Sequence, residues 1–165
     1  IRVNRPQLHT YIQSVTKEIA DIGVQFRAKF LVSIEAIEAE RLQVYLSGVK
    51  TEKGRAKRLA KYEAGDAKAL DAVRFNPGSN SQLATLFVDK LGIVPVFFTD
   101  KGAPSFKSAM LSQWGEGGAI LRTRRKRGIV LKHSEALYKM SEVTGRFHPS
   151  LRTAGTKTGR YVGAN

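Results

Sequence analysis

Apolar residues recur every three or four positions through residues 8–37, a spacing that places them on one face of an α-helix. The pattern predicts one long amphipathic helix. Asn4 is placed to cap its start, Pro6 suits its first turn, and Gly48 is placed to end it. Gly23 is the weakest interior position, so a kink is expected there.

The pattern changes after this helix. Residues 48–74 are basic, rich in alanine and poor in large apolar side chains. They predict a short helix over residues 54–63, a turn at Gly65 and a second short helix. With so few large apolar side chains, this segment cannot form a hydrophobic core of its own.

A turn over residues 75–78 precedes a capping box, in which Ser79 accepts a hydrogen bond from the backbone amide of Gln82 and Gln82 reaches back. The helix that starts here is expected to end at Gly92. Four of its side chains are expected to point inward: Leu83, Leu86, Phe87 and Leu91.

The next segment alternates between extended and helical signals. Residues 93–98 predict a short strand or extended segment, and residues 99–102 predict a turn. A short helix follows as far as Trp114, with Ser105 as its cap.

The glycine-rich stretch of residues 115–118 is expected to end the preceding short helix before a second long helix begins. This helix is predicted over residues 119–140, with an interruption at Gly128. A turn at residues 144–145 then precedes two strands, residues 146–151 and 156–162. Helices first and strands last predict an α+β fold that is mostly α, a helical domain followed by the opening strands of a sheet.

Charge is distributed unevenly. The chain has 28 Lys and Arg against 14 Asp and Glu, a net charge of +14, of which residues 48–165 carry +13. The excess gathers in two clusters. One comprises Lys50, Lys53, Arg55, Lys57, Arg58 and Lys61, and the other Arg122, Arg124, Arg125, Lys126 and Arg127.

A single basic run is commonly a solvated helix face, but two runs in so basic a segment favour a polyanionic partner. Nucleic acid is the leading candidate because lysines and arginines bound to phosphates release condensed counterions. The runs lack the opposing Trp, Phe and Leu face of a membrane-surface helix. The longest apolar stretch, residues 93–98, is far shorter than the roughly 20 residues that span a membrane.

Residues for catalysis and metal binding are sparse. There is no cysteine, which excludes disulfides, thiol catalysis and thiolate zinc sites. His9, His133 and His148 are far apart in sequence, and the 14 acidic residues show no pairing suited to two metal ions. The glycines match neither a P-loop nor a nucleophile elbow. The sequence therefore predicts a binding surface without a reaction centre.

The chain contains a series of short blocks: Ile1–Asn4, Phe75–Ser79, Gln82–Leu83, Leu91–Gly92 and Lys101–Ser105. In their order and approximate spacing, these blocks resemble the thumb of family A DNA polymerases, the bacterial polymerase I and phage type. Thr144–His148 and Thr156–Arg160 resemble the first two strands of the palm. The resemblance implies a thumb subdomain of long antiparallel helices and short tip helices over residues 1–143, and the start of a palm over residues 144–165.

The family implies a fragment of a DNA-directed DNA polymerase, a nucleotidyltransferase of replication or repair, that grips the primer–template duplex through its minor groove and phosphates. Arg160 is expected in the minor groove at the primer terminus, where the acceptors are common to every correct pair. Helix N-termini at Ser79 and Ser105 are expected to offer amides to phosphates. The full set of expected DNA contacts is Arg160, Thr158, Lys157, Arg152, Asn76, Ser79, Ser105, Arg124, Arg125, Arg127 and Lys132.

The chain departs from the family in two places. A lysine that relatives carry one turn after the helix arginine falls at Gly128. Relatives also pass from the first helix almost directly to the Phe-Asn block, whereas here a basic stretch, residues 27–73, intervenes. Some phage members hold a processivity insertion in this region, so the stretch is either a DNA-facing extended tip or a site for a processivity factor.

The family's catalytic aspartates, which bind Mg²⁺, and its fingers helix lie beyond Asn165. The isolated chain is therefore expected to bind DNA without extending it and to hold no cofactor, with Mg²⁺ needed in the complete enzyme. Expected partners are primer–template DNA and the palm and fingers, in the cytoplasm of a bacterial or phage-infected cell, with no membrane. The alternative is a stand-alone basic nucleic-acid-binding protein without enzymatic activity; a nuclease is less favoured.

Overall fold

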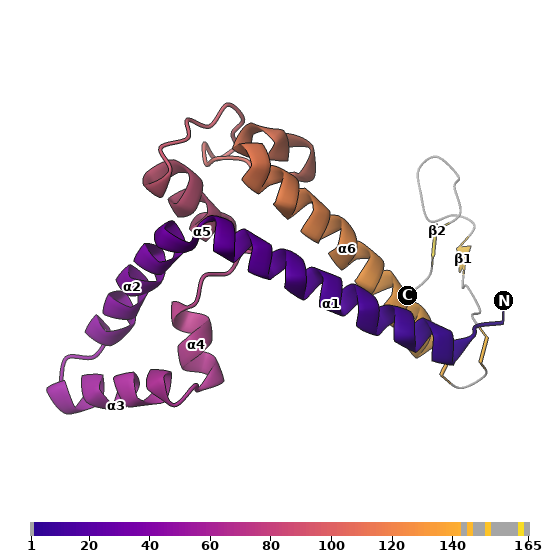
Figure 1. Cartoon of the computed structure of the whole chain (residues 1–165), viewed down its shortest axis with the longest axis horizontal. Helices are drawn as coiled ribbons and strands as arrows, with labels where there is room; N and C mark the ends of the chain where they lie inside the picture. The colour runs from indigo at the N-terminus through magenta and orange to yellow at the C-terminus, as the bar shows by residue number, and fades with distance from the viewer. Residues whose placement is uncertain (1, 143–144, 147–150, 153–161, 164–165) are drawn as a thin grey trace. The chain divides into compact units, whose positions relative to one another are not determined.

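A computed structural model of the chain describes residues 2–142, 145–146, 151–152 and 162–163. The chain divides into two compact units, one formed by Ile1–Ala20 with Lys126–Asn165 and the other by Asp21–Arg125. Two long helices, α1 (Arg5–Lys29) and α6 (Gly115–Met140), each contribute residues to both units (Figure 1).

The predicted single N-terminal helix is wrong at one point. The chain breaks at Phe30, where φ is −115° and ψ is 27°, and continues as α2 (Leu31–Ser47). The Phe30 ring lies 4.9 Å from that of Phe26 and 5.8 Å from that of Phe87, so the chain turns where this ring enters the core. Gly23, the expected kink, stays helical because an intact backbone ladder compensates for its weak propensity.

The two short helices predicted after α2 are confirmed as α3 (Glu52–Glu63) and α4 (Ala67–Val73), with a turn at Gly65, where φ is 77°. Thr51 caps α3 and Asp66 caps α4, each accepting a hydrogen bond from a backbone amide three residues on. α3 buries no residue, whereas α4 buries two small apolar residues. Figure 1 shows α3 crossing between the ends of α2 and α4.

The helix predicted after Ser79 forms as α5 (Asn80–Ala84), continued by a π-helical turn, η1 (Thr85–Lys90). It ends as expected at Gly92, where φ is 64°. Ser79 occupies the N-cap position, but its side chain accepts no hydrogen bond from a backbone amide, so the predicted capping box is wrong. Of the four side chains expected to be inward, three are buried, whereas Leu91 is 38% exposed.

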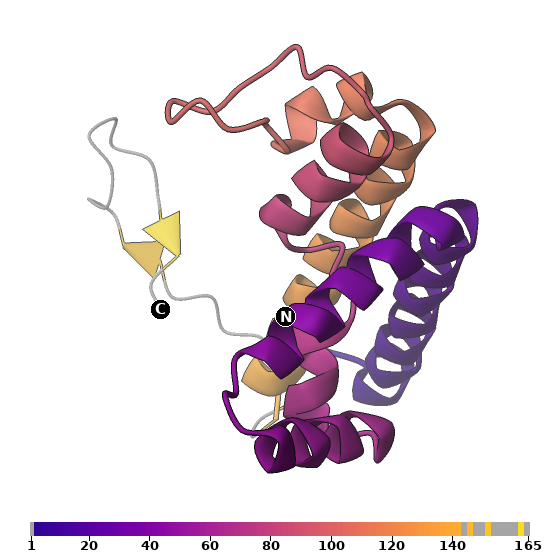
Figure 2. The same ribbon diagram turned by 90° about the vertical axis from the view of Figure 1, so that its left-hand side faces the viewer.

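The extended segment and the turn predicted after Gly92 are confirmed (Figure 2). The Thr99 amide donates to the carbonyl of Ala103 across the turn. The expected cap at Ser105 is wrong, because the next helix is the 3₁₀ helix η2 (Ser108–Trp114) and Ser105 is only 2% exposed. Ser105 is buried because its carbonyl accepts from the indole N–H of Trp114 at 3.2 Å.

The second long helix begins earlier than expected, because the glycine-rich stretch forms the first turn of α6 rather than a break. A Cβ added at Gly118 would lie 1.8 Å from the carbonyl oxygen of Leu111, and one at Gly117 would lie 2.6 Å from the ring of Phe87. These two glycines therefore permit close packing. Gly128 does not interrupt the helix.

The core of the unit Asp21–Arg125 contains a cluster of packed aromatic rings. The Trp114 ring stacks on Phe106 at a centroid distance of 4.7 Å and on Phe87 at 5.2 Å. Aliphatic side chains from α2, α5, η1, η2 and α6 complete it. The core residues are Phe26, Ile34, Ile37, Leu83, Leu86, Phe87, Phe106, Leu111, Trp114 and Leu121.

The other unit pairs the start of α1 with the end of α6. The Arg5 guanidinium lies 4.4 Å from the centre of the Tyr138 ring, and the His9 ring lies 5.8 Å from it. Asn4 caps α1 as predicted, accepting from the Gln7 amide at 3.2 Å.

The predicted α+β fold class is wrong. The described residues are mostly helical, and β1 (Leu151–Arg152) and β2 (Val162–Gly163) are a two-residue antiparallel pairing. Two residues per strand are too few to form a sheet layer. Most of the residues predicted as strands, 146–151 and 156–162, lie outside the described part of the chain.

Candidate nucleic-acid interface

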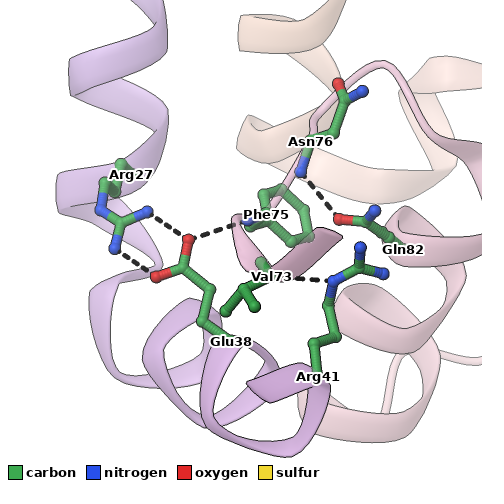
Figure 3. Close-up of polar contacts among 7 residues, drawn as sticks. All are labelled: Arg27, Glu38, Arg41, Val73, Phe75, Asn76 and Gln82. Carbon is green, nitrogen blue, oxygen red and sulfur yellow. Dashed lines mark hydrogen bonds and ion pairs between the residues drawn. The ribbon is translucent and has the colours of Figure 1, made fainter. Parts of the chain in front are cut away.

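One carboxylate joins α1, α2 and the turn that contains Asn76. Glu38 on α2 accepts two hydrogen bonds from the guanidinium of Arg27 on α1, at 2.7 and 2.6 Å. The same carboxylate accepts a hydrogen bond of 2.8 Å from the backbone amide of Phe75 (Figure 3). Two consecutive helices and a turn 37 residues after Glu38 are thereby fixed at one point.

The hydrogen bonds at this carboxylate favour its charged form. The Arg27 guanidinium, helped by the Phe75 amide, lowers the pKa of Glu38 against the opposing effect of burial. The Glu38 carboxylate correspondingly raises the pKa of Arg27. The Glu38 side chain is only 14% exposed, so solvent screens this bidentate pair less than an ordinary surface pair.

Further contacts hold the two ends of the turn. Arg41 donates from Nε to the carbonyl of Val73, at the end of α4, at 3.0 Å. The Gln82 side chain on α5 accepts from the backbone amide of Asn76 at 2.7 Å (Figure 3). In place of the expected bond to Ser79, Gln82 thus reaches back to the preceding turn.

Asn76 is exposed at the outside of this turn, and in Figure 3 its side chain points away from Arg41. Its Oδ1 accepts from the backbone amide of Gly78 at 2.8 Å, so the NH₂ group is the donor that this exposed side chain can offer to a partner. The Ser79 amide donates to the Asn76 carbonyl at 3.0 Å. The structure therefore brings together two of the predicted contact residues, Asn76 and Ser79.

The arginine run on α6 does not form one basic face, because consecutive residues are turned by about 100° around a helix. Arg125 donates to the carbonyl of Phe106, and burial, with help from Arg124, lowers its pKa. Arg127 pairs with Glu18 at 2.9 Å.

The rest of the run is also only partly accessible. Arg122 and Arg124 are half-buried, and within the described part of the chain the Nε of each is buried without a hydrogen-bond partner. Lys126 is the exposed member of the run. The run thus has one exposed cation and four half-buried ones, and its contacts with DNA stay a prediction.

The remaining predicted contact residues lie apart from this turn in the sequence. Ser105 is buried under Trp114, and Lys132 is exposed on α6. Arg152 lies in β1. Lys157, Thr158 and Arg160 lie outside the described residues.

The sequence did not identify Glu38 and Arg41 as residues that position the Asn76 turn, because their partners are more than 30 residues away. Within the described ranges, no group of three or more His, Cys, Asp or Glu residues could hold a metal ion. None of the helices searched there is long and apolar enough to span a membrane.

Comparison with known proteins relates the chain to DNA polymerases. No family model matches it. It is 27% identical over 173 aligned residues to the DNA polymerase of Bacillus phage SP01, and the match covers 97% of this chain. The chain spans 18% of the length of that polymerase. The match extends along nearly the whole chain, which supports a relationship between this protein and a phage DNA polymerase.

Proposed function

We propose that this chain is the segment of a DNA polymerase that grips the primer–template duplex, a thumb subdomain of the family A type with residues 27–73 as its extended tip. The observation that carries the proposal is the Asn76 turn. Glu38 and Gln82 hold this turn, and it presents an amide donor to solvent in a chain related to a DNA polymerase.

The chemistry of the turn suits contact that does not depend on base sequence. A neutral amide can donate to the acceptors that all base pairs present in the minor groove or to a phosphate oxygen. The net charge of +14 adds long-range attraction to the phosphate backbone. In this proposal, positioned hydrogen-bond donors hold the bound duplex, and the positive charge attracts DNA to the chain.

Nucleotide transfer belongs to the rest of the polymerase in this proposal, together with the Mg²⁺ ions that transfer needs. The chain itself contributes affinity and orientation. Incubation with primer–template DNA, Mg²⁺ and nucleotides should therefore give no extended primer, and extension by the isolated chain would contradict this part of the proposal.

The test compares binding to a primer–template with a recessed end and to a blunt duplex of the same length, by fluorescence anisotropy. The chain should prefer the recessed end. Asn76→Ala should weaken that binding by about 3–10-fold, the value of one hydrogen bond. Asn80→Ala is the matched control, because Asn80 is exposed nearby on α5 and plays no part in the proposed contact.

A second substitution separates contact from turn geometry. Asn76→Asp keeps the oxygen that accepts from Gly78 but replaces the NH₂ donor with a negative oxygen. It should weaken binding at least as much as Asn76→Ala. If wild type and all variants bind both DNAs equally, the chain is better explained as a stand-alone basic nucleic-acid-binding protein, which is the alternative that its charge supports.

A further inference from the structure

The five basic residues of α3 fall into two sets, and its two arginines make internal contacts. Arg58 lies 5.0 Å from the centre of the Tyr45 ring on α2 and donates to the carbonyl of the same residue. Arg55 donates from Nε to the carbonyl of Val49 at 2.9 Å. The Arg58 contacts fasten α3 to α2, and the Arg55 contact fastens it to the connection between the two helices.

The three lysines of α3, Lys53, Lys57 and Lys61, are exposed, and no ion pair to them occurs among the described residues. They are spaced four residues apart, so they lie within about 80° of the helix circumference. The acidic residues of α3, Glu52 and Glu63, lie about 120–140° around the helix from the middle lysine. The result is a uniformly positive stripe, the α3 lysine stripe.

The dimensions of the stripe match a polyanion with closely spaced charges. Successive lysines are about 6 Å apart along the helix axis, so the stripe is about 12 Å long. Duplex DNA carries one negative charge per roughly 1.7 Å of its axis, so such a stripe meets several phosphates in any register. Lysine is a compact charge on a flexible stem, which suits contact without fixed geometry.

The stripe lacks the residues that usually anchor a protein partner. Protein interfaces rely on buried aromatic, aliphatic and arginine anchors, and both arginines of α3 are already engaged. The exposed large apolar residue of α3, Leu59, lies on another side, where it lines a hollow with Gln43 and Leu46 of α2. The composition of the stripe therefore favours phosphates over a protein surface.

From this geometry we infer that the α3 lysine stripe is a second DNA-contacting surface, which holds the phosphate backbone of the duplex independently of the Asn76 turn. The inference rests on the proposed function. In Figure 1, α3 lies at the opposite end of α4 from α5, so the stripe and the turn sit at opposite ends of that helix. The stripe adds affinity for duplex DNA but does not recognise the primer end.

The test is the salt dependence of duplex binding by the full 165-residue chain. The triple variant Lys53→Gln, Lys57→Gln, Lys61→Gln should reduce the slope of log affinity against log salt by about 2.7, which is roughly 0.9 for each phosphate that a lysine neutralises. Its affinity deficit should therefore shrink about 40-fold between roughly 50 and 200 mM salt. The matched control removes three exposed lysines elsewhere: Lys17→Gln, Lys107→Gln, Lys139→Gln.

Circular dichroism should show both triple variants folded, because every replaced side chain is exposed. If the α3 variant and the control change the slope equally, the charge acts through the field of the whole molecule and the inference fails. It also fails if the α3 variant binds duplex as wild type does but no longer binds polyglutamate, which would assign the stripe to an acidic protein.

The same samples distinguish the inference from the proposed function. Preference for the recessed end depends on the Asn76 turn, so the α3 variant should keep it. A wild-type chain without end preference, together with a reduced slope in the α3 variant alone, would reject the proposed function and retain the stripe. A wild-type chain that prefers the recessed end, together with an unchanged slope in the α3 variant, would retain the proposed function and reject the stripe.

Discussion

The two basic clusters carry the same net charge, +5 over residues 50–61 and +5 over residues 122–127, yet their side chains lie in different environments. On α3, three lysines share one exposed face, whereas Arg55 and Arg58 donate to the backbone carbonyls of Val49 and Tyr45. On α6, the five cations are distributed around the helix, and Arg125 and Arg127 are engaged by Phe106 and Glu18. A charge run therefore does not become a charged surface unless the helical register aligns it.

Packing explains the difference. α6 contributes residues to both compact units, and the four arginines of its run are half-buried. A guanidinium stays charged there because a backbone carbonyl or a carboxylate can satisfy its donors. α3 buries none of its residues, so its lysines remain in water.

The largest expected effect on stability comes from disrupting the close packing of α6 against Leu111 of η2. Gly118→Ala places a Cβ 1.8 Å from the Leu111 carbonyl, which the backbone cannot accommodate without moving. We expect a loss of about 3 kcal/mol or more in the free energy of unfolding, measured with urea. Gly128→Ala, in open space on the same helix, should instead stabilise by about 0.5–1 kcal/mol. Equal stability of the two variants would refute the close packing.

A smaller effect is expected where α1 and the Asn76 turn are joined to α2. Glu38→Gln removes the ion pair with Arg27 but keeps an oxygen for the Phe75 amide, and should cost about 1–2 kcal/mol at pH 7 in urea denaturation. Glu40→Gln, at an exposed carboxylate that pairs with Lys90, should cost less than about 1 kcal/mol. An equal cost for the two substitutions would contradict the special role of Glu38.

The pH dependence of the Glu38 contribution has a definite sign. The folded-state pKa of Glu38 lies below its unfolded value of about 4.3, so its contribution is complete above that pH and is lost as pH falls through the folded pKa. The stability gap between wild type and Glu38→Gln should therefore close as pH falls below about 4. A gap that stays constant from pH 7 to about pH 2.5, well below the unfolded pKa, would contradict the assignment.

The smallest effect separates two neighbours within the arginine run. Arg125→Ala removes a donor from the Phe106 carbonyl and should cost about 1 kcal/mol. Lys126→Ala, at an exposed position, should change stability by less than about 0.5 kcal/mol. Thermal denaturation of the two variants side by side tests this, and a Lys126 effect as large as that of Arg125 would remove the contrast between buried and exposed cations.

Local signals in the sequence predicted much of the helical pattern. The apolar period predicted the start of α1, and the composition around Gly65 predicted α3 and α4. The end of the α5–η1 helix followed from Gly92, which adopts the positive φ that glycine tolerates best. Each of these features depends on residues only a few positions apart.

The predictions that were wrong share a different cause, which is contact between residues far apart in sequence. Phe30 ends α1 because its ring packs against Phe87, and Ser105 is buried because Trp114 binds its carbonyl. The candidate site shows the same division: Asn76 was identified in the sequence, but Glu38, which positions its turn, was not. Periodicity and capping contain no information about contacts between distant segments.

The sequence by itself determined the helical character of most of the chain, its strong positive charge and the residues from which a binding surface can be made. The tertiary structure decided which cations reach solvent and which satisfy internal carbonyls and carboxylates. The physical reason is that helical register and burial against distant segments fix where each side chain points. Charge density along the chain is the same whichever way those side chains face.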